Sequence, residues 1–192
     1  MHVGTDAEVM QFLSANQWNY GIKTRAQQLY YDMPEANRFE LKFPDLPGRA
    51  AYFSRRAARL GVSDDLTFYG AALWITYAEL GSLSPIGWRI IEKMRQGFGE
   101  NRSLQNARAH FFRENELQDL EAFLLPCFIF GWDAYLMPFA SNDFFVHVSH
   151  DEYWGVVSKT EEAHQKLLKE LSDLDPIESE SMRRRFCFPK DV

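Results

Sequence analysis

Residues 132–149 constrain the fold of this chain more than any other stretch. Two runs rich in apolar and aromatic residues, 132–138 and 144–149, flank the sequence Phe-Ala-Ser-Asn-Asp. Extended runs separated by a loop of this length are typical of a β-hairpin. Gly131, just before the first run, suits the end of a helix. The stretch therefore predicts a helix end followed by two antiparallel strands.

Helices are indicated elsewhere by apolar residues that recur every three or four positions and by capping residues. The predicted helices cover residues 6–17, 23–31, 49–60, 84–99, 115–131 and 160–171. We expect Pro126 to kink its helix or to end it early. A further short helix is predicted over residues 150–157, because Ser149 and Glu152 have the spacing of a capping box.

Three further strands are predicted over residues 38–43, 67–77 and 109–113. In the first, apolar and charged residues alternate, which predicts a buried face with Phe39 and a solvated face with Glu40. Residues 67–77 would also fit a helix, but Gly70 would be costly there, so we prefer a strand.

No internal repeat and no Pro-, Gly- or Ser-rich linker divides the 192 residues, which are enough to bury one hydrophobic core. We predict an α+β fold with a small, largely antiparallel sheet, including the hairpin near residues 132–149, packed against several helices. One globular domain is expected over residues 1–175. A loosely ordered tail is expected over residues 176–192.

Composition limits the classes of partner. The formal net charge of −6 argues against a general nucleic-acid binder, because contact with phosphates needs a basic face. Cys127 and Cys187 show no metal-ligand or disulfide spacing. The start of the chain lacks a secretion signal, and the longest apolar run, 123–130, is too short to cross a membrane. We therefore expect a cytoplasmic protein that needs no membrane partner.

Residues 147–152, His-Val-Ser-His-Asp-Glu, contain the densest group of chemically active side chains. His147 and His150 could bind a metal with Asp133 or Asp151 as an oxygen ligand. Residues three apart on a strand face opposite sides, however, so we predict no metal and no other cofactor. The structural alternative is that Ser149 only caps a helix, with Asp151 near its positive end.

Asp133 could face His150 across the hairpin and fix its tautomer, as an acid–base pair requires. With Asp151, these two residues are the candidate catalytic groups. Aromatic side chains next to them are candidate binding residues, and these are Trp132, Tyr135, Tyr153 and Trp154.

Several of these segments, including GAALWIT at residues 70–76, GWDAYL at residues 131–136 and SHDEY at residues 149–153, resemble a group of uncharacterised bacterial proteins. The resemblance extends over roughly residues 67–157. It implies a bacterial, cytoplasmic origin, and it implies no activity.

The sequence lacks the common nucleotide-binding, hydrolase and zinc-protease motifs. Together with the acidic charge and an aromatic content of 15%, this favours a non-catalytic protein-binding or regulatory protein, for example a toxin-neutralising (immunity-like) one, and it is compatible with a homo-oligomer. A metal-assisted or acid–base hydrolase is the alternative, and it would use His147, His150, Asp151 and Asp133. A second alternative is nucleic-acid contact through the arginines at 49, 55, 56, 59 and 183–185.

Overall fold

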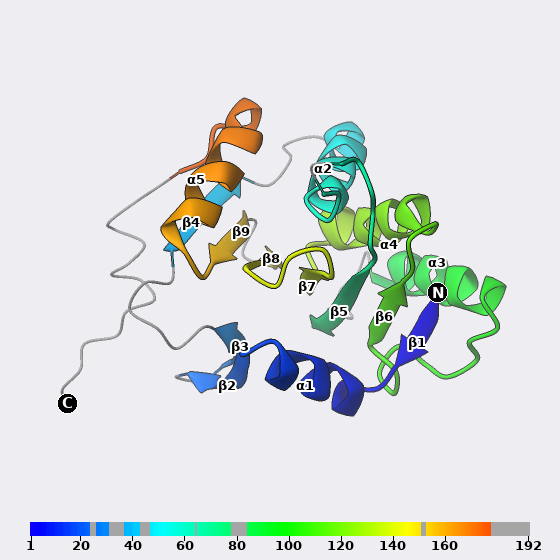
Figure 1. Cartoon of the computed structure of the whole chain (residues 1–192). Coiled ribbons are helices and arrows are strands. Elements are labelled where there is room, and N and C mark those ends of the chain that lie inside the picture. Colours follow the sequence, from blue (N-terminus) through cyan, green and yellow to red (C-terminus); the bar gives the residue numbers. More distant parts are fainter. Residues whose placement is uncertain are drawn as a thin grey trace.

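The computed structural model describes residues 1–23, 26–30, 37–42, 47–63, 65–77, 84–150 and 153–177. Within them, seven antiparallel strands form one sheet in the order β1-β6-β5-β7-β8-β9-β4 (Figure 1), which confirms the predicted α+β class. The strands of this sheet are β1 (His2–Gly4), β4 (Asn37–Lys42), β5 (Ala71–Tyr77), β6 (Ala109–Phe112), β7 (Asp133–Pro138), β8 (Phe144–Ser149) and β9 (Tyr153–Ser158). The helices are α1 (Asp6–Ala15), α2 (Pro47–Arg59), α3 (Ser84–Gly97), α4 (Leu117–Phe130), α5 (Glu161–Glu170) and the short 3-10 helix η1 (Ser172–Leu174). Strands β2 (Asn19–Lys23) and β3 (Ala26–Tyr30) pair separately.

The hairpin predicted over residues 132–149 is confirmed as β7 and β8, in which Leu136 lies opposite Val146. The preceding helix, α4, ends at Gly131, whose left-handed φ of 60° suits glycine. Pro126 does not end α4 early, because the helix continues to Phe130. The residues around Pro126 are buried, and this burial offsets the cost of about 3 kcal/mol that a proline imposes inside a helix.

Alternate residues of the central strands point to opposite faces of the sheet, and each face has its own core. On one face, α2 to α5 cover side chains such as Leu73, Leu136 and Val146, which are at most 1% exposed. Each such side chain stabilises the fold by about 1.5–3 kcal/mol. Figure 1 shows α2, α3 and α4 on this side of the sheet and α1 on the other.

Helix α1 packs on the opposite face of the sheet. The second core joins α1 and the following turn to the sheet, and it includes Val9, Leu13, Trp18, Trp74, Tyr135 and Phe145. Asp6 accepts a hydrogen bond from the Trp74 indole at 3.0 Å. Lys159 donates to the carbonyl of Asn16 at 2.6 Å and lies 4.4 Å from the centroid of the Trp18 ring. These contacts fix both ends of α1 against the sheet.

Strand β9 replaces the helix predicted over residues 150–157. Trp154 and Val156 are buried on the face covered by helices, whereas Tyr153 is only partly buried on the other face. This two-residue period fits a strand, and pairing with β8 places Ser149 opposite Tyr153. The capping-box prediction was wrong because a local pattern of polar residues competes poorly with a strand that has partners on both sides. Glu152, the proposed capping partner of Ser149, and Asp151 lie outside the described residues.

Two smaller predictions are also corrected. Residues 26–30 form strand β3 instead of part of a helix, because pairing with β2 overrides a weak local preference for helix. Glu40 is buried and not solvated, since it forms an ion pair with Arg38 at 2.9 Å.

Helix α3 contacts the core through Gly87 and Ile91, one helical turn apart. Ile86 and Ile90 are apolar and have helical spacing, yet they are 61% and 42% exposed. The reason is that Gly87 allows close approach of the Phe130 ring, so the helix is rotated toward its glycine.

Replacing Gly87 with Ala is expected to destabilise the protein by about 1–3 kcal/mol, even though alanine favours helix, because the new methyl group would lie 2.6 Å from the Phe130 ring. Gly97→Ala in the same helix is the matched control, since nothing lies within 4 Å of the added carbon there. Urea unfolding of both variants checks this. Equal stabilities for the two variants would contradict the close-approach argument.

Candidate functional site

Three titratable side chains meet where β7 begins and β8 ends. The carboxylate of Asp133 accepts two hydrogen bonds from His150, one from the backbone N–H at 2.9 Å and one from Nδ1 at 2.8 Å. Nε2 of His147 lies 3.6 Å from the same carboxylate. The predicted pairing of Asp133 with His150 is therefore observed, and the two histidines share one carboxylate.

The electrostatics of Asp133 reflect two opposing effects. Burial acts to raise the pKa of this carboxyl group, but hydrogen bonding and the charge of His147, together with the backbone N–H of His150, bring the pKa below its usual value. Asp133 therefore remains ionised at neutral pH and also ties the β8–β9 turn to β7.

His147 is enclosed by aromatic rings. It stacks on Tyr135 with ring centroids 4.5 Å apart and meets Tyr153 edge to face at 6.0 Å. Burial lowers the pKa of His147, and Asp133 only partly offsets this effect. His147 is therefore neutral at physiological pH, which suits a positioning role.

His150 is the accessible member of the group, since its side chain is 49% exposed. Its Nδ1 faces Asp133, which favours the tautomer with the proton on Nδ1 and makes Nε2 the basic nitrogen. An Asp–His pair of this kind can transfer a proton to or from a bound molecule.

The candidate binding residues are placed differently from the prediction. Trp132, Tyr135 and Trp154 are buried, so their rings belong to the cores and offer no surface to a partner. Tyr153 is partly exposed, and the guanidinium of Arg38 lies 5.4 Å from its ring centroid. Asp151, the third candidate catalytic residue, lies outside the described residues. Among the described residues, no group of three or more His, Cys, Asp or Glu side chains is arranged to hold a metal ion.

A second feature of the surface was not predicted. A cavity of about 950 Å³ lies among the end of α2, the turn after it, the β7–β8 loop and α5, and we name it the α2–α5 groove. Buried apolar side chains such as Leu60, Phe144 and Leu167 contribute to its lining. It also contains charged residues of both signs, which include Arg59, Lys166, Glu162 and Glu170.

Leu66, in the turn after α2, borders the α2–α5 groove in an unusual conformation. Its side chain is 86% exposed, and its φ of 64° is left-handed. A left-handed backbone costs a residue with a Cβ about 1–2 kcal/mol. Ser63 and Asp65 indicate a turn in the sequence. Nothing in the sequence indicates that Leu66 adopts the left-handed backbone conformation that glycine and asparagine favour.

The turn is held by its own hydrogen bonds. The Leu66 N–H donates to the carbonyl of Ser63 at 2.9 Å, and the Thr67 N–H donates to the Asp65 carboxylate at 3.1 Å. The hydroxyl of Tyr69 also donates to Asp65, at 3.3 Å. The strained conformation of Leu66 is therefore fixed in advance.

Two arginines of α2 have carboxylate partners. Arg56 pairs with Asp173 at 2.7 Å, and Arg55 lies 3.6 Å from Glu121. These partners reduce the positive potential that a nucleic acid would meet on α2. The other basic segment, 183–185, lies outside the described residues.

No helix in the described part of the chain is long and apolar enough to cross a membrane. No protein family, curated protein or solved structure matches this chain.

The stability of the protein is expected to fall as the pH is lowered below about 6.5, because the folded state holds His147 neutral while the unfolded chain protonates its histidines. Each such group contributes a slope of up to about 1.4 kcal/mol per pH unit. Below about pH 4, protonation of Asp133 removes further stability. Urea unfolding between pH 4 and 7 should give a shallower slope for His147→Gln, and an unchanged slope would contradict this assignment.

Proposed function

We propose that this chain is a non-catalytic, regulatory protein that binds another protein through the α2–α5 groove. The observation that carries the proposal is the exposed, left-handed Leu66 at the edge of the groove. An exposed leucine and a strained backbone both cost free energy, and neither improves the packing of the fold. A partner that buried the Leu66 side chain would offset the cost of exposing it, and the left-handed backbone would hold the side chain in position for that contact.

The geometry of the turn supports a binding anchor. Its internal hydrogen bonds fix Leu66 before any partner arrives, so little conformational entropy would be lost on binding. Tyr69, which is 46% exposed, is hydrogen-bonded to the same turn and adds an aromatic ring of the kind enriched at binding hot spots.

The lining of the groove suggests the chemistry of the partner. Apolar residues at its base suit an apolar side chain, and charges of both signs around them suit a protein segment with mixed charges. A nucleic acid would need a predominantly basic surface, and the net charge of the chain is −6.

Leu66→Asn is expected to raise the free energy of unfolding by about 1 kcal/mol, because asparagine adopts left-handed backbone at lower cost. The same change is expected to weaken partner binding about 10-fold or more, as for loss of a hot-spot side chain. Urea unfolding measures the first effect. Retention of proteins from the source cell lysate on the immobilised variant, followed by affinity measurement of the retained protein, measures the second.

Ile86→Asn is the matched control, since it removes an exposed apolar side chain on α3, away from the groove. We expect a partner retained by the wild type to be kept by Ile86→Asn and lost by Leu66→Asn. A partner that binds the wild type and Leu66→Asn equally would refute the groove as the binding site. If the pure protein self-associates and Leu66→Asn abolishes this, the proposal of a separate partner protein is wrong, and the groove binds a second copy of this chain.

A second candidate function rests on the hydrogen bond of 2.8 Å between Asp133 and Nδ1 of His150. It is acid–base hydrolysis, in which Nε2 of His150 would take a proton from water as the water attacks a carbonyl carbon. His147 would help to hold Asp133 in place.

The acid–base candidate predicts that hydrolysis of activated esters depends on His150. His150→Gln should lower the rate about 100-fold or more, the usual contribution of a general base. His2→Gln is the control for a non-specific effect of another exposed histidine. Equal rates in the wild type and His150→Gln would remove this candidate.

A further inference from the structure

A cationic side chain is buried in the core between α3 and the sheet. Arg95, near the end of α3, is only 1% exposed. One guanidinium nitrogen, Nη2, donates to the carbonyl of Ala107 at 2.9 Å. The other two, Nε and Nη1, are buried and have no hydrogen-bond partner. Guanidinium groups stay protonated in proteins, so both are N–H donors without an acceptor.

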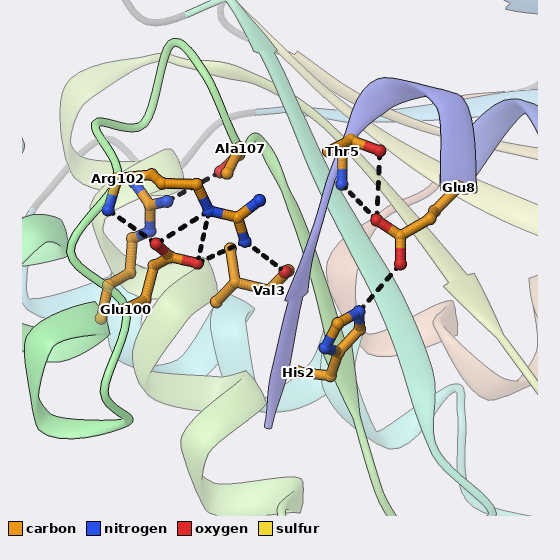
Figure 2. A network of polar contacts seen from close by, with 8 residues as sticks. His2, Val3, Thr5, Glu8, Glu100, Arg102 and Ala107 are labelled. Carbon is orange, nitrogen blue, oxygen red and sulfur yellow. Dashed lines mark hydrogen bonds and ion pairs between the residues drawn. The ribbon is translucent and has the colours of Figure 1, made fainter.

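The nearby carboxylate does not neutralise Arg95 directly. Figure 2 shows Glu100 bound by Arg102, which donates from its backbone at 2.6 Å and from Nε and Nη2 at 2.6–3.1 Å. Arg102 also donates to the carbonyl of Val3. Hydrogen bonds from Arg102 lower the pKa of Glu100 to about 2, so this pair is already neutral overall. Within the described part of the chain, Arg95 forms no ion pair.

A second buried polar atom lies in the same core. The side chain of His110, on β6, is fully buried, and its ring lies 5.0 Å from that of Phe123. Its Nδ1 is 3.4 Å from the carbonyl of Leu73, and its Nε2 has no hydrogen-bond partner. Burial, and then the charge of Arg95, lower the pKa of His110 to about 3, so His110 is neutral.

An isolated buried charge is costly. Moving an ion from water into a protein interior costs several kcal/mol even after relaxation, and more than about 90% of buried polar groups have a partner. Arg95 cannot escape the cost by losing its proton. Within the described residues no group accepts a hydrogen bond from Nε or Nη1, so an anion or water from outside these residues would have to fill the site.

We propose that the Arg95 guanidinium holds a small monovalent anion of the halide class inside this core. Glu100 and Glu92 act on the charge of Arg95 without a hydrogen bond to it, so a single small anion is enough to satisfy the free N–H donors. The Arg95 side chain is 1% exposed, and Ala107, whose carbonyl accepts the one hydrogen bond from the guanidinium, is fully buried. A compact halide fits such surroundings better than an oxyanion such as sulfate, which is larger and more strongly hydrated. The anion would couple the end of α3 to β6 and to the loop that contains Ala107.

The first test compares thermal unfolding in chloride, bromide, sulfate and gluconate at constant ionic strength. Above the Kd, each tenfold rise in chloride or bromide is expected to raise Tm by about 3–6 °C, and gluconate should have no such effect. Arg95→Met should lose this dependence. Arg89→Met, at an exposed position of the same helix, should keep it.

The second test needs no variant and remains decisive if Arg95→Met fails to fold. Crystals grown in bromide should show an anomalous peak in contact with Nε or Nη1 of Arg95. Chloride should also shift the NMR signals of the Arg95 Nε–H and of the His110 ring in the wild-type protein. A site without an anomalous peak, combined with a Tm that does not distinguish halide from gluconate, would overturn the proposal and assign the site to water.

Discussion

The two-residue alternation along β5, β7, β8 and β9 is the constraint on which the structure depends. Leu136 and Val146 face the core covered by α2 to α5, while Tyr135 faces the core under α1. A one-residue slip in pairing would exchange these sets and expose both groups of apolar side chains. The same register places Asp133 at the start of β7 beside the residue that follows β8. The acid–base group is thus a consequence of how the sheet is packed.

The two candidate sites lie at opposite ends of one hairpin. Asp133 and His150 meet where β7 starts and β8 stops, whereas the loop that joins these strands borders the α2–α5 groove. Both sites depart from the most stable local arrangement, through a partly exposed Asp–His pair at one end and a strained Leu66 at the other. Arg95 is a third departure inside the core. Proteins commonly tolerate such local costs where they bind or react, because the rest of the fold is consistent.

The hairpin and the pairing of Asp133 with His150 could be predicted because both follow from local pattern: alternation, loop length and strand direction. Strand β9 could not, because the polar residues before it mimic a helix start, and only pairing with β8 and β4 decides the outcome. Leu66 was missed for a different reason. The backbone angle of a turn depends on which hydrogen bonds close it, and composition records only that a turn occurs. Arg95 carries no sequence signal beyond being a charged residue near a helix end, and its hydrogen bond to Ala107 comes from the loop that leads from α3 into β6.

The order of the strands in the sheet has a consequence for how the chain folds. Strands β1 and β4 precede their pairing partners along the chain, yet they lie at the two opposite edges of the sheet. Strand β1 pairs with β6, whose register reaches Phe111, and β4 pairs with β9, whose register reaches Ser158. Neither early strand has its partner until much of the chain has left the ribosome. The sheet must therefore assemble from its centre outward. Contacts between residues this far apart in sequence slow folding. Until their partners are available, β1 and β4 have unpaired edges that could pair incorrectly or aggregate.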